Sequence, residues 1–517
     1  MNKVTYKSLF NRFRDTTLIN KCEQYAYWTL PYTMADTAEI GSSGRVIVER
    51  DFQEIGALLT NNLAAKLARI LFPTQYAFFQ ASATPAFMSA AKEHGLTEES
   101  VRGEFAKLEM AANRRLFINS GYATLILMLK HLIITGQVLL HRDTKTGEMC
   151  AWGLQNFATR RDGRGKLLDC VLREFTTVEA LPPELQVALR TANRAMYSRP
   201  EQPVEKYTRI HRGIRRGVEG FEVSQEIDTI STGAATWYPT NLCPWMVPTW
   251  VIIPGEHYGR GMVEEYAGGF ATLSSLSESA SLYGIEMMRV LHLVGAGGGG
   301  DPEDLAEAES GEWRRGDPEQ IKVHEAGDAR KLETIEARIM NAITRLSRAF
   351  MYQGGTRDAE RVTAYELQRD AQEAENTLGG VYSSLSGQVQ VPLAHILMVE
   401  ASDQVLPGLI SGDLMPDVTA GIPALGRSAD VQNLLMAAQE ISAIAPLSQI
   451  DPRISMGKLI DMIFAGRSID TTQVFYSPAE QKANAEASAA QAQGQQNMLA
   501  AQTLADSSQQ IQQTLGA

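Results

Sequence analysis

Hydrophobic residues between positions 262 and 288 recur at every third or fourth place, which predicts a long helix. Their spacing averages about 3.5 residues, as in a helix that packs along its whole length against a neighbour. An ordinary core helix gives the same periodicity, so both interpretations stand here. The apolar positions are Met262, Tyr266, Phe270, Leu273, Leu276, Ala280, Tyr283 and Met287.

A second amphipathic segment spans residues 332–352. Three arginines, Arg338, Arg345 and Arg348, lie among its remaining positions. The pattern predicts a second long helix with one apolar stripe. Its apolar stripe consists of Ile335, Ile339, Ile343, Leu346 and Phe350.

The insert between these helices, residues 289–331, is rich in glycine and charge and predicts an exposed lobe. Its sequence GAGGGG fits the GxGxxG pattern of dinucleotide-binding loops. The acidic residues that come next, Asp301, Glu303 and Asp304, would repel a pyrophosphate at a helix N-terminus, and no βαβ pattern surrounds them. A nucleotide site is therefore the less favoured interpretation.

A basic loop at residues 353–363 comes after the second helix, and two glycines free its backbone. Arg357 and Arg361 either contact phosphates or form a solvated turn with Asp358 and Glu360. The local sequence does not choose between these two interpretations.

The segments after this loop are predicted to be mostly helical. A capping box formed by Thr363 and Glu366 predicts a helix over Ala364–Leu378. Further helix is predicted from Leu393 through Ala401. From Ser477 the chain turns to Ala, Gln and Ser, which permit helix but supply no core of their own.

The N-terminal half combines predicted helices with predicted strands. Helices are expected over residues 1–35, from Ile55 to Leu71 and over 98–119. Short apolar runs between 136 and 254 predict an antiparallel or mixed sheet. The basic sequence RRDGRGK at 160–166 is interpreted as a solvated loop, with DNA contact as the alternative.

Composition restricts how the chain could bind nucleic acid. The 517 residues carry a formal net charge of -12, and 44% are hydrophobic. Such a chain can bury a sizeable core, but any DNA contact must be local. The α+β fold class is expected from the predicted elements, with helix predominating.

Cysteine usage and hydropathy suggest a reducing compartment and no membrane anchor. The four cysteines are scattered without CxxC pairing. The most apolar window, Tyr122–Leu140, is interrupted by Lys130 and His131, so it is interpreted as a buried helix. The first residues, MNKVTYKSLFNRFRD, lack the apolar core of a signal peptide.

Catalytic motifs are not found in the sequence. It contains no HExxH, GxSxG, GxxxxGK[ST] or EF-hand pattern, and its eight histidines are dispersed. We therefore expect no catalytic residue, no metal and no cofactor.

Five sequence blocks in one order resemble the portal, or head-to-tail connector, proteins of short-tailed bacteriophages. They run from about Leu59 to Leu393, and their order makes the resemblance more specific than any short motif. The blocks are LTNNLAAKLARILFP (59–73), NSGYATLILMLKHLIITGQVLL (119–140), GEHYGRGMVEEY (255–266), ERVTAYEL (360–367) and NTLGGVYSSLSGQVQVPL (376–393).

The resemblance implies a division of the chain into the parts of a portal subunit. The expected parts are a peripheral α/β wing (1–260), a stem helix (261–288), a clip (289–331), a second stem helix (332–352), a channel loop (353–363), a long helix with the wing/crown connection (364–425), a helical crown (426–476) and an Ala/Gln-rich tail (477–517).

The resemblance also implies the function and the partners. About twelve copies would form a ring at one capsid vertex, assembled in the host cytoplasm and placed at the head-tail junction of the virion. The ring would conduct double-stranded DNA during packaging and ejection, and would meet capsid and scaffolding proteins, the packaging motor (terminase) and tail adaptor proteins. The expected DNA-contact residues are Arg345, Arg348, Arg357 and Arg361.

Two alternatives from other classes remain open on the sequence. One is a nucleotide-binding enzyme that uses the GAGGGG loop. The other is an oligomeric scaffold whose helices associate without any passage of DNA. A subunit ring with a central hole would favour the portal over both.

Overall fold

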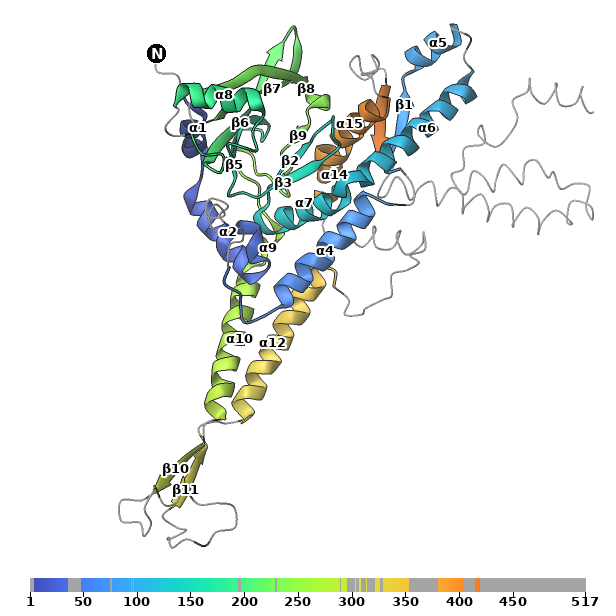
Figure 1. Ribbon diagram of the computed structural model, residues 1–517. Helices are drawn as coiled ribbons and strands as arrows, with labels where there is room; N and C mark the ends of the chain where they lie inside the picture. The colour runs from blue at the N-terminus through green and yellow to red at the C-terminus, as the bar shows by residue number, and fades with distance from the viewer. Residues whose placement is uncertain are drawn as a thin grey trace, which may run out of the picture. The chain divides into compact units, whose positions relative to one another are not determined.

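The computed structural model describes residues 4–35, 48–74, 77–93, 95, 97–193, 197–227, 230–288, 290–294, 303, 306–307, 313, 321–325, 329–352, 380–402 and 414–418 (Figure 1). The chain divides into two units, Met1–Ala424 and Leu425–Ala517, and every described residue belongs to the first. The predicted loop 353–363, the helix Ala364–Leu378, the crown 426–476 and the tail 477–517 therefore lie outside the described residues.

A five-stranded antiparallel sheet forms much of the N-terminal half. Its strands succeed one another as a meander, β4-β5-β6-β7-β8, so each pairs with its sequence neighbour. The turn between β6 and β7 has positive φ at Arg216 (54°) and Gly217 (80°), as a two-residue type I′ hairpin requires. The strands are β4 (Phe157–Arg161), β5 (Leu167–Thr177), β6 (Pro203–Arg215), β7 (Val218–Ile227) and β8 (Ile230–Pro239).

Helix α1 (Tyr6–Phe13) packs across β4, β5 and β6. Its buried Phe10 contacts Ala158, Val171 and Tyr207, one from each strand. Side-chain caps start this helix and the next: Thr5 Oγ1 accepts from the backbone of Ser8, and Asp15 Oδ1 accepts from that of Leu18. Helix α2 (Thr16–Trp28) and a 3₁₀ turn (Pro31–Met34) come next.

The rest of the core is helical and surrounds a small sheet. Strands β2 (Leu139–Arg142), β3 (Met149–Trp152) and β9 (Trp245–Met246) form that sheet in the order β3-β2-β9. The helices around it are α4 (Ile55–Leu71), α6 (Glu98–Phe117), α7 (Gly121–Thr135) and α15 (Val391–Ser402). Helix α4 packs on α7, and α15 packs on α6. The described residues thus have an α+β fold.

Smaller elements complete the described part of the chain. Strand β1 (Phe79–Ala83) pairs antiparallel with β12 (Leu414–Val418), which joins segments far apart in the sequence. Helix α5 (Pro85–Glu93) lies between β1 and α6 along the chain, and 3₁₀ turns occupy Ile118–Ser120 and Thr240–Leu242. Helix α14 (Val381–Leu385) continues through a π-helical turn, Ser386–Gln390, into α15.

The segment that passes a length-and-hydropathy test for a membrane span is partly buried and ends in a helix of the core. Residues Ser100–Thr135 pass that test among the described residues. They are not one continuous helix, because Asn119 and Ser120 have left-handed φ values of 54° and 61° and break it. Helix α7 then buries Leu125, Leu129, Leu132 and Ile133, all 0% exposed. The predicted buried helix over Tyr122–Leu140 is confirmed to Thr135, but Leu139–Arg142 is a strand.

Three glycines allow the end of α7 to pack closely against residues 259–261. A Cβ at Gly136 (φ 77°) would lie 2.4 Å from the carbonyl carbon of Arg260, and one at Gly259 would lie 2.4 Å from the carbonyl oxygen of Gly136. At Gly261 it would lie 2.7 Å from the carbonyl oxygen of Ile134. Real Cβ atoms do not approach so closely, which gives a packing reason for two glycines of the sequence block GEHYGRGMVEEY.

Buried polar side chains connect elements that are distant in the sequence. Arg142 of β2 and Glu400 of α15 form a two-bonded ion pair, Nε to Oε1 and Nη2 to Oε2, each 2.7 Å. Their side chains are 0% and 2% exposed. Gln390 donates to the backbone oxygen of Leu71 at 2.5 Å, and Gln388 Oε1 accepts from the backbone of Thr249 at 2.8 Å. The last described helices are thereby fastened to α4 and to the segment after β9.

Two expectations need correction. The helix predicted over 262–288 is interrupted at Tyr266, so that α9 (Met262–Glu265) precedes α10 (Ala267–Met287). The sequence RRDGRGK is not a wholly solvated loop. Arg161 is buried and donates to the backbone oxygens of Gly165 and Val247, each at 3.0 Å, and Arg160 pairs with Asp169.

Candidate functional site

Two long antiparallel helices form an arm that ends in a β-ribbon (Figure 1). Helix α10 (Ala267–Met287) leads into β10 (Val290–Val294), and β11 (Ile321–Glu325) leads back into α12 (Ala329–Ala349). The ribbon is antiparallel, with Val290 opposite Glu325 and Val294 opposite Ile321. The sequence predicts the two helices but not these strands, which flank a glycine-rich and charged insert.

An aromatic cluster holds the arm together near its base. Phe350, just after α12, is 0% exposed and makes edge contacts with Tyr266 and Phe270, at centroid distances of 5.9 and 5.6 Å. Leu346, one turn earlier, lies 3.2 Å from the Cβ position of Gly269. The apolar stripe of the second predicted helix therefore packs on α10, as a packing seam requires.

The end of α12 is fixed by a lysine from α4. Met351 has a left-handed φ of 54°, which ends the helix, and its backbone oxygen accepts a hydrogen bond of 2.6 Å from Lys66 Nζ. A cation at this place also suits the negative end of the helix dipole. Lys66 thus holds the C-terminal end of α12 in place. Sequence reasoning missed this contact, because 285 residues separate the two partners.

The basic residues of α12 lie on one exposed side of the helix. At 3.6 residues per turn, they fall within a sector of about 100°, away from the stripe that packs on α10. The acidic Glu333 and Glu336 lie on another side. The basic set is Arg330, Lys331, Arg338, Arg345 and Arg348, all exposed. Helix α10, in contrast, contains no Lys or Arg and carries Glu278 and Glu286. The basic charge of the arm's helices therefore belongs to α12 alone.

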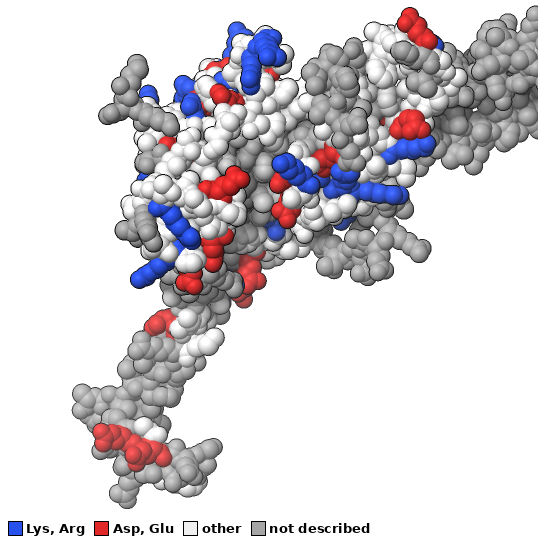
Figure 2. Space-filling view, turned by 45° about the horizontal axis from the view of Figure 1, so that its top comes forward, with Lys and Arg blue, Asp and Glu red and all other residues white. Residues whose placement is uncertain are grey.

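Outside the arm, the described residues do not form a broad basic face in the direction of Figure 2. On the face shown, Lys and Arg side chains are interspersed with Asp and Glu side chains. This agrees with the formal net charge of -12. Because phosphate contacts depend on local positive charge, the exposed side of α12 is the better candidate for contact with nucleic acid.

The structure describes two of the four predicted DNA-contact residues. Arg345 and Arg348 are exposed on the basic side of α12, and neither has an ion-pair partner among the described residues. Arg357 and Arg361 lie outside the described residues. Contact of any of the four with DNA stays a prediction.

Groups that could hold a metal ion do not gather in the part of the chain that the structure describes. No set of three or more His, Cys, Asp or Glu side chains there could hold a metal ion. The four cysteines are free. His131 is enclosed in the core, and burial lowers its pKa to about 4, so it is neutral.

The glycine-rich sequence GAGGGG lacks the setting of a dinucleotide site. The strand before it, β10, pairs antiparallel with β11. A Rossmann loop instead leads from a parallel strand into a helix within a βαβ unit. The nucleotide alternative therefore has no support from the elements that flank this sequence.

Comparisons with known proteins give consistent results along nearly the whole chain. The sequence model of the family described as bacteriophage head to tail connecting protein matches residues 5–474. The portal protein of Pseudomonas phage phiKMV is 42% identical over 500 residues, 96% of this chain and 97% of that protein. The portal protein of Escherichia phage T7 is 30% identical over 515 residues, 96% and 92% of the two chains.

Among solved structures, the neck of an empty gene transfer agent particle aligns with 77% of this chain and 94% of its own. The identity is 14% and the TM-score is 0.38. A likeness at that score carries no conclusion, whereas the two sequence relatives match this chain over 96% of its length.

Proposed function

The chain belongs to the bacteriophage head to tail connecting protein family, and we propose that its copies form the ring through which double-stranded DNA enters and leaves the virus head. Relatives named portal proteins, one of them 42% identical over 96% of the chain, carry this proposal. Proteins of this family are structural, and we assign this chain no catalytic step and no cofactor. Its place would be the head-tail junction of the virion, after assembly in the host cytoplasm.

The helical arm supplies the physical part of the proposal. Helices α10 and α12 would be the stem, the ribbon β10–β11 with its insert the clip, and residues 1–260 the wing. In a closed ring each copy presents one surface to the next and a different surface to the previous copy. About twelve copies would repeat the basic side of α12 around a central opening. Capsid and scaffolding proteins, the motor (terminase) and tail adaptors would bind other surfaces of the ring.

Contact between α12 and DNA would involve phosphates rather than bases. A channel must pass every sequence, and phosphate contacts do not depend on sequence. They are also screened by salt, so each contact forms and breaks readily. Arg345 and Arg348, together with Arg357 and Arg361 of the adjoining loop, are the proposed contacts.

Replacing Arg345 and Arg348 should weaken DNA binding without affecting assembly of the ring. In the variant Arg345→Ala/Arg348→Ala we expect intact rings, because these side chains are exposed and unpaired among the described residues. The slope of log K for DNA against log salt should fall by about 0.9 for each arginine that contacts a phosphate. Binding of a blunt duplex to purified rings at several salt concentrations measures this slope, and packaging of full-length DNA measures the consequence.

Controls separate a local contact from a general change of charge. Arg215→Ala, an exposed arginine at the end of β6, removes the same charge outside the arm and should leave the slope unchanged. Arg357→Ala/Arg361→Ala tests the loop in the same assay. If the α12 variant binds and packages DNA like the parent, the basic side of α12 does not line the channel. If the purified chain forms no ring, the proposed function itself is wrong.

A further inference from the structure

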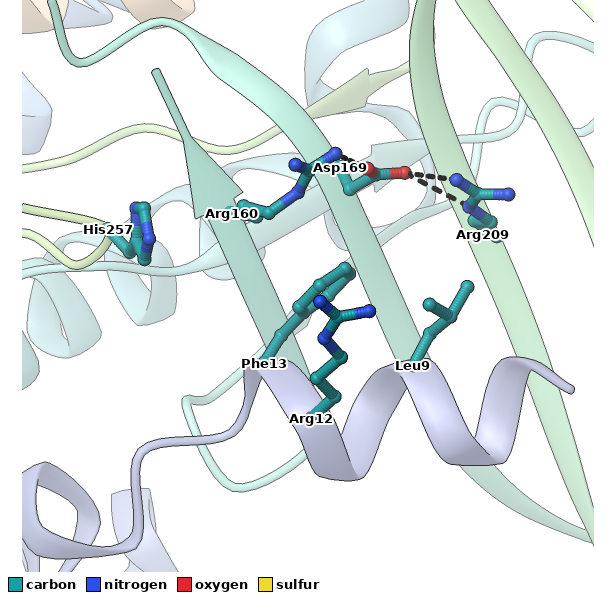
Figure 3. A pocket seen from close by; sticks show the side chains of 7 residues that line it. All are labelled: Leu9, Arg12, Phe13, Arg160, Asp169, Arg209 and His257. Atoms are coloured by element: carbon teal, nitrogen blue, oxygen red, sulfur yellow. Dashed lines mark hydrogen bonds and ion pairs between the residues drawn. The ribbon is translucent and has the colours of Figure 1, made fainter. Parts of the chain in front are cut away.

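A cationic cavity of about 360 Å³ lies between α1 and the five-stranded sheet, and His257 also lines it (Figure 3). Helix α1 contributes Leu9, Arg12 and Phe13, whose side chains point toward the strands. The strand side comes from three adjacent strands, with Arg160 on β4, Asp169 on β5 and Arg209 on β6. The meander topology brings Arg209 beside Arg160 and Asp169, although 40 residues separate Arg209 from Asp169.

Asp169 orients the two strand arginines. Its carboxylate is 1% exposed and accepts from Arg160 Nη2 at 2.6 Å and from Arg209 Nη2 at 2.7 Å and Nε at 3.0 Å. His211 Nδ1 lies 2.8 Å from the same carboxylate. Burial raises the pKa of Asp169, but the hydrogen bonds from Arg160 and Arg209 outweigh it and hold that pKa below its ordinary value. Asp169 is therefore a carboxylate that fixes both guanidinium groups.

The cavity keeps an excess of positive charge and of hydrogen-bond donors. Three guanidinium groups face one carboxylate. Each guanidinium has five N–H donors, and Arg160 uses one of them on Asp169 while its buried Nε has no partner among the described residues. Arg12 is exposed and has no hydrogen-bonding or ion-pairing partner in the described part of the chain. The strand arginines remain reachable, since their side chains are 43% (Arg160) and 27% (Arg209) exposed.

The apolar side chains that line the cavity limit which anions its arginines can bind. Leu9 and Phe13 line the cavity beside the arginines, and the guanidinium carbon of Arg160 lies 5.5 Å from the ring centre of Phe13. A side chain with a short aliphatic stem and a terminal carboxylate matches both parts, because guanidinium groups bind carboxylates in a planar, two-bonded way.

We propose that this cavity binds the carboxylate of an aspartate or glutamate side chain in an acidic segment of a partner protein. A neighbouring cavity of about 620 Å³ shares Arg12, Phe13 and His257 with it and continues along the start of α2. That continuation gives the main chain on one side of the bound residue a place to lie, and its charged lining mixes Arg14, Lys21 and Arg260 with Asp15, Glu256 and Glu264. The site does not depend on the passage of DNA, since no residue of the arm takes part.

Binding of a short acidic peptide to the purified full-length chain tests the proposal. The probe is the acetylated, amidated tripeptide Gly-Glu-Gly, detected by saturation-transfer NMR, with Gly-Gln-Gly as the neutral counterpart. We expect the glutamate peptide to bind and the glutamine peptide not to bind. In Arg12→Gln the dissociation constant should rise by about 10-fold or more, as expected for the loss of a charge-assisted hydrogen bond. Because Arg12 is exposed and unpaired among the described residues, the variant should unfold at the same temperature as the parent.

The matched control is Arg215→Gln, an exposed arginine outside the cavity, which should leave peptide binding unchanged. Equal binding of the two peptides, or equal affinity of Arg12→Gln and the parent, would overturn the assignment. Inorganic phosphate should displace the glutamate peptide only weakly. If phosphate abolishes the signal of the glutamate peptide at a concentration below the dissociation constant of that peptide, the cavity is a phosphate site and not a carboxylate site.

Discussion

Arg142→Met is expected to lower the free energy of unfolding by about 3–5 kcal/mol, because it leaves the buried carboxylate of Glu400 without its partner. The two side chains are 0% and 2% exposed and share two hydrogen bonds of 2.7 Å. Arg142 also donates to the partly buried backbone oxygen of Arg115 at 3.2 Å, and the same change removes this hydrogen bond. Urea unfolding of the full-length chain, monitored by tryptophan fluorescence, measures the loss.

The same substitution at an exposed pair is the natural control. Arg212 and Glu219 also lie 2.7 Å apart, but the Glu219 side chain is 55% exposed. Arg212→Met should therefore cost less than about 1 kcal/mol. The double variant Arg142→Met/Glu400→Met should regain most of the lost stability, because an apolar pair replaces the buried charges. If Arg142→Met is no less stable than Arg212→Met, the ion pair contributes little to joining β2 and α15.

Phe350→Ala is expected to destabilise the base of the helical arm by about 3–5 kcal/mol, the usual cost of deleting a fully buried aromatic ring. Phe350 is 0% exposed and is in edge contact with both Tyr266 and Phe270. Removal of the ring would leave an empty space between α10 and α12, next to the hydrogen bond from Lys66 to Met351. Hydrogen exchange should therefore become faster in both helices, while the five-stranded sheet keeps its protection.

Met340 provides the comparison on the same helix, because it is 61% exposed. Met340→Ala should change stability by less than about 0.5 kcal/mol, as at other surface positions. If hydrogen exchange in α10 and α12 is equally fast in Phe350→Ala and Met340→Ala, the aromatic cluster does not hold these two helices together. A loss of protection throughout the sheet would instead mean that the arm and the sheet unfold as one unit.

Periodicity along the chain was sufficient to predict the two helices of the arm, apart from the interruption at Tyr266, and the presence of a sheet, but it left open whether that sheet is antiparallel or mixed. The stripe at Ile339, Leu346 and Phe350 recurs at helical spacing, and helix formation depends on such local spacing. The arginines of α12 fit the same helical spacing, since Arg338, Arg345 and Arg348 occupy positions between those of the apolar stripe. Strands β10 and β11 escaped this reasoning, because five residues each beside a charged insert give too short a pattern.

Local sequence could not decide which charged residues are structural. In the sequence RRDGRGK, Arg160 and Arg161 are neighbours of the same type, yet Arg161 is buried against backbone oxygens while Arg160 turns to Asp169. Likewise nothing near Arg142 indicates its partner, which lies 258 residues away. The sequence by itself determined most of the helices, the main sheet and the family, because these depend on spacing and on the order of sequence blocks along the chain. Only the tertiary structure decided the pairing of charges and the cationic cavity, because strand order and helix packing bring together side chains whose separation along the chain carries no signal.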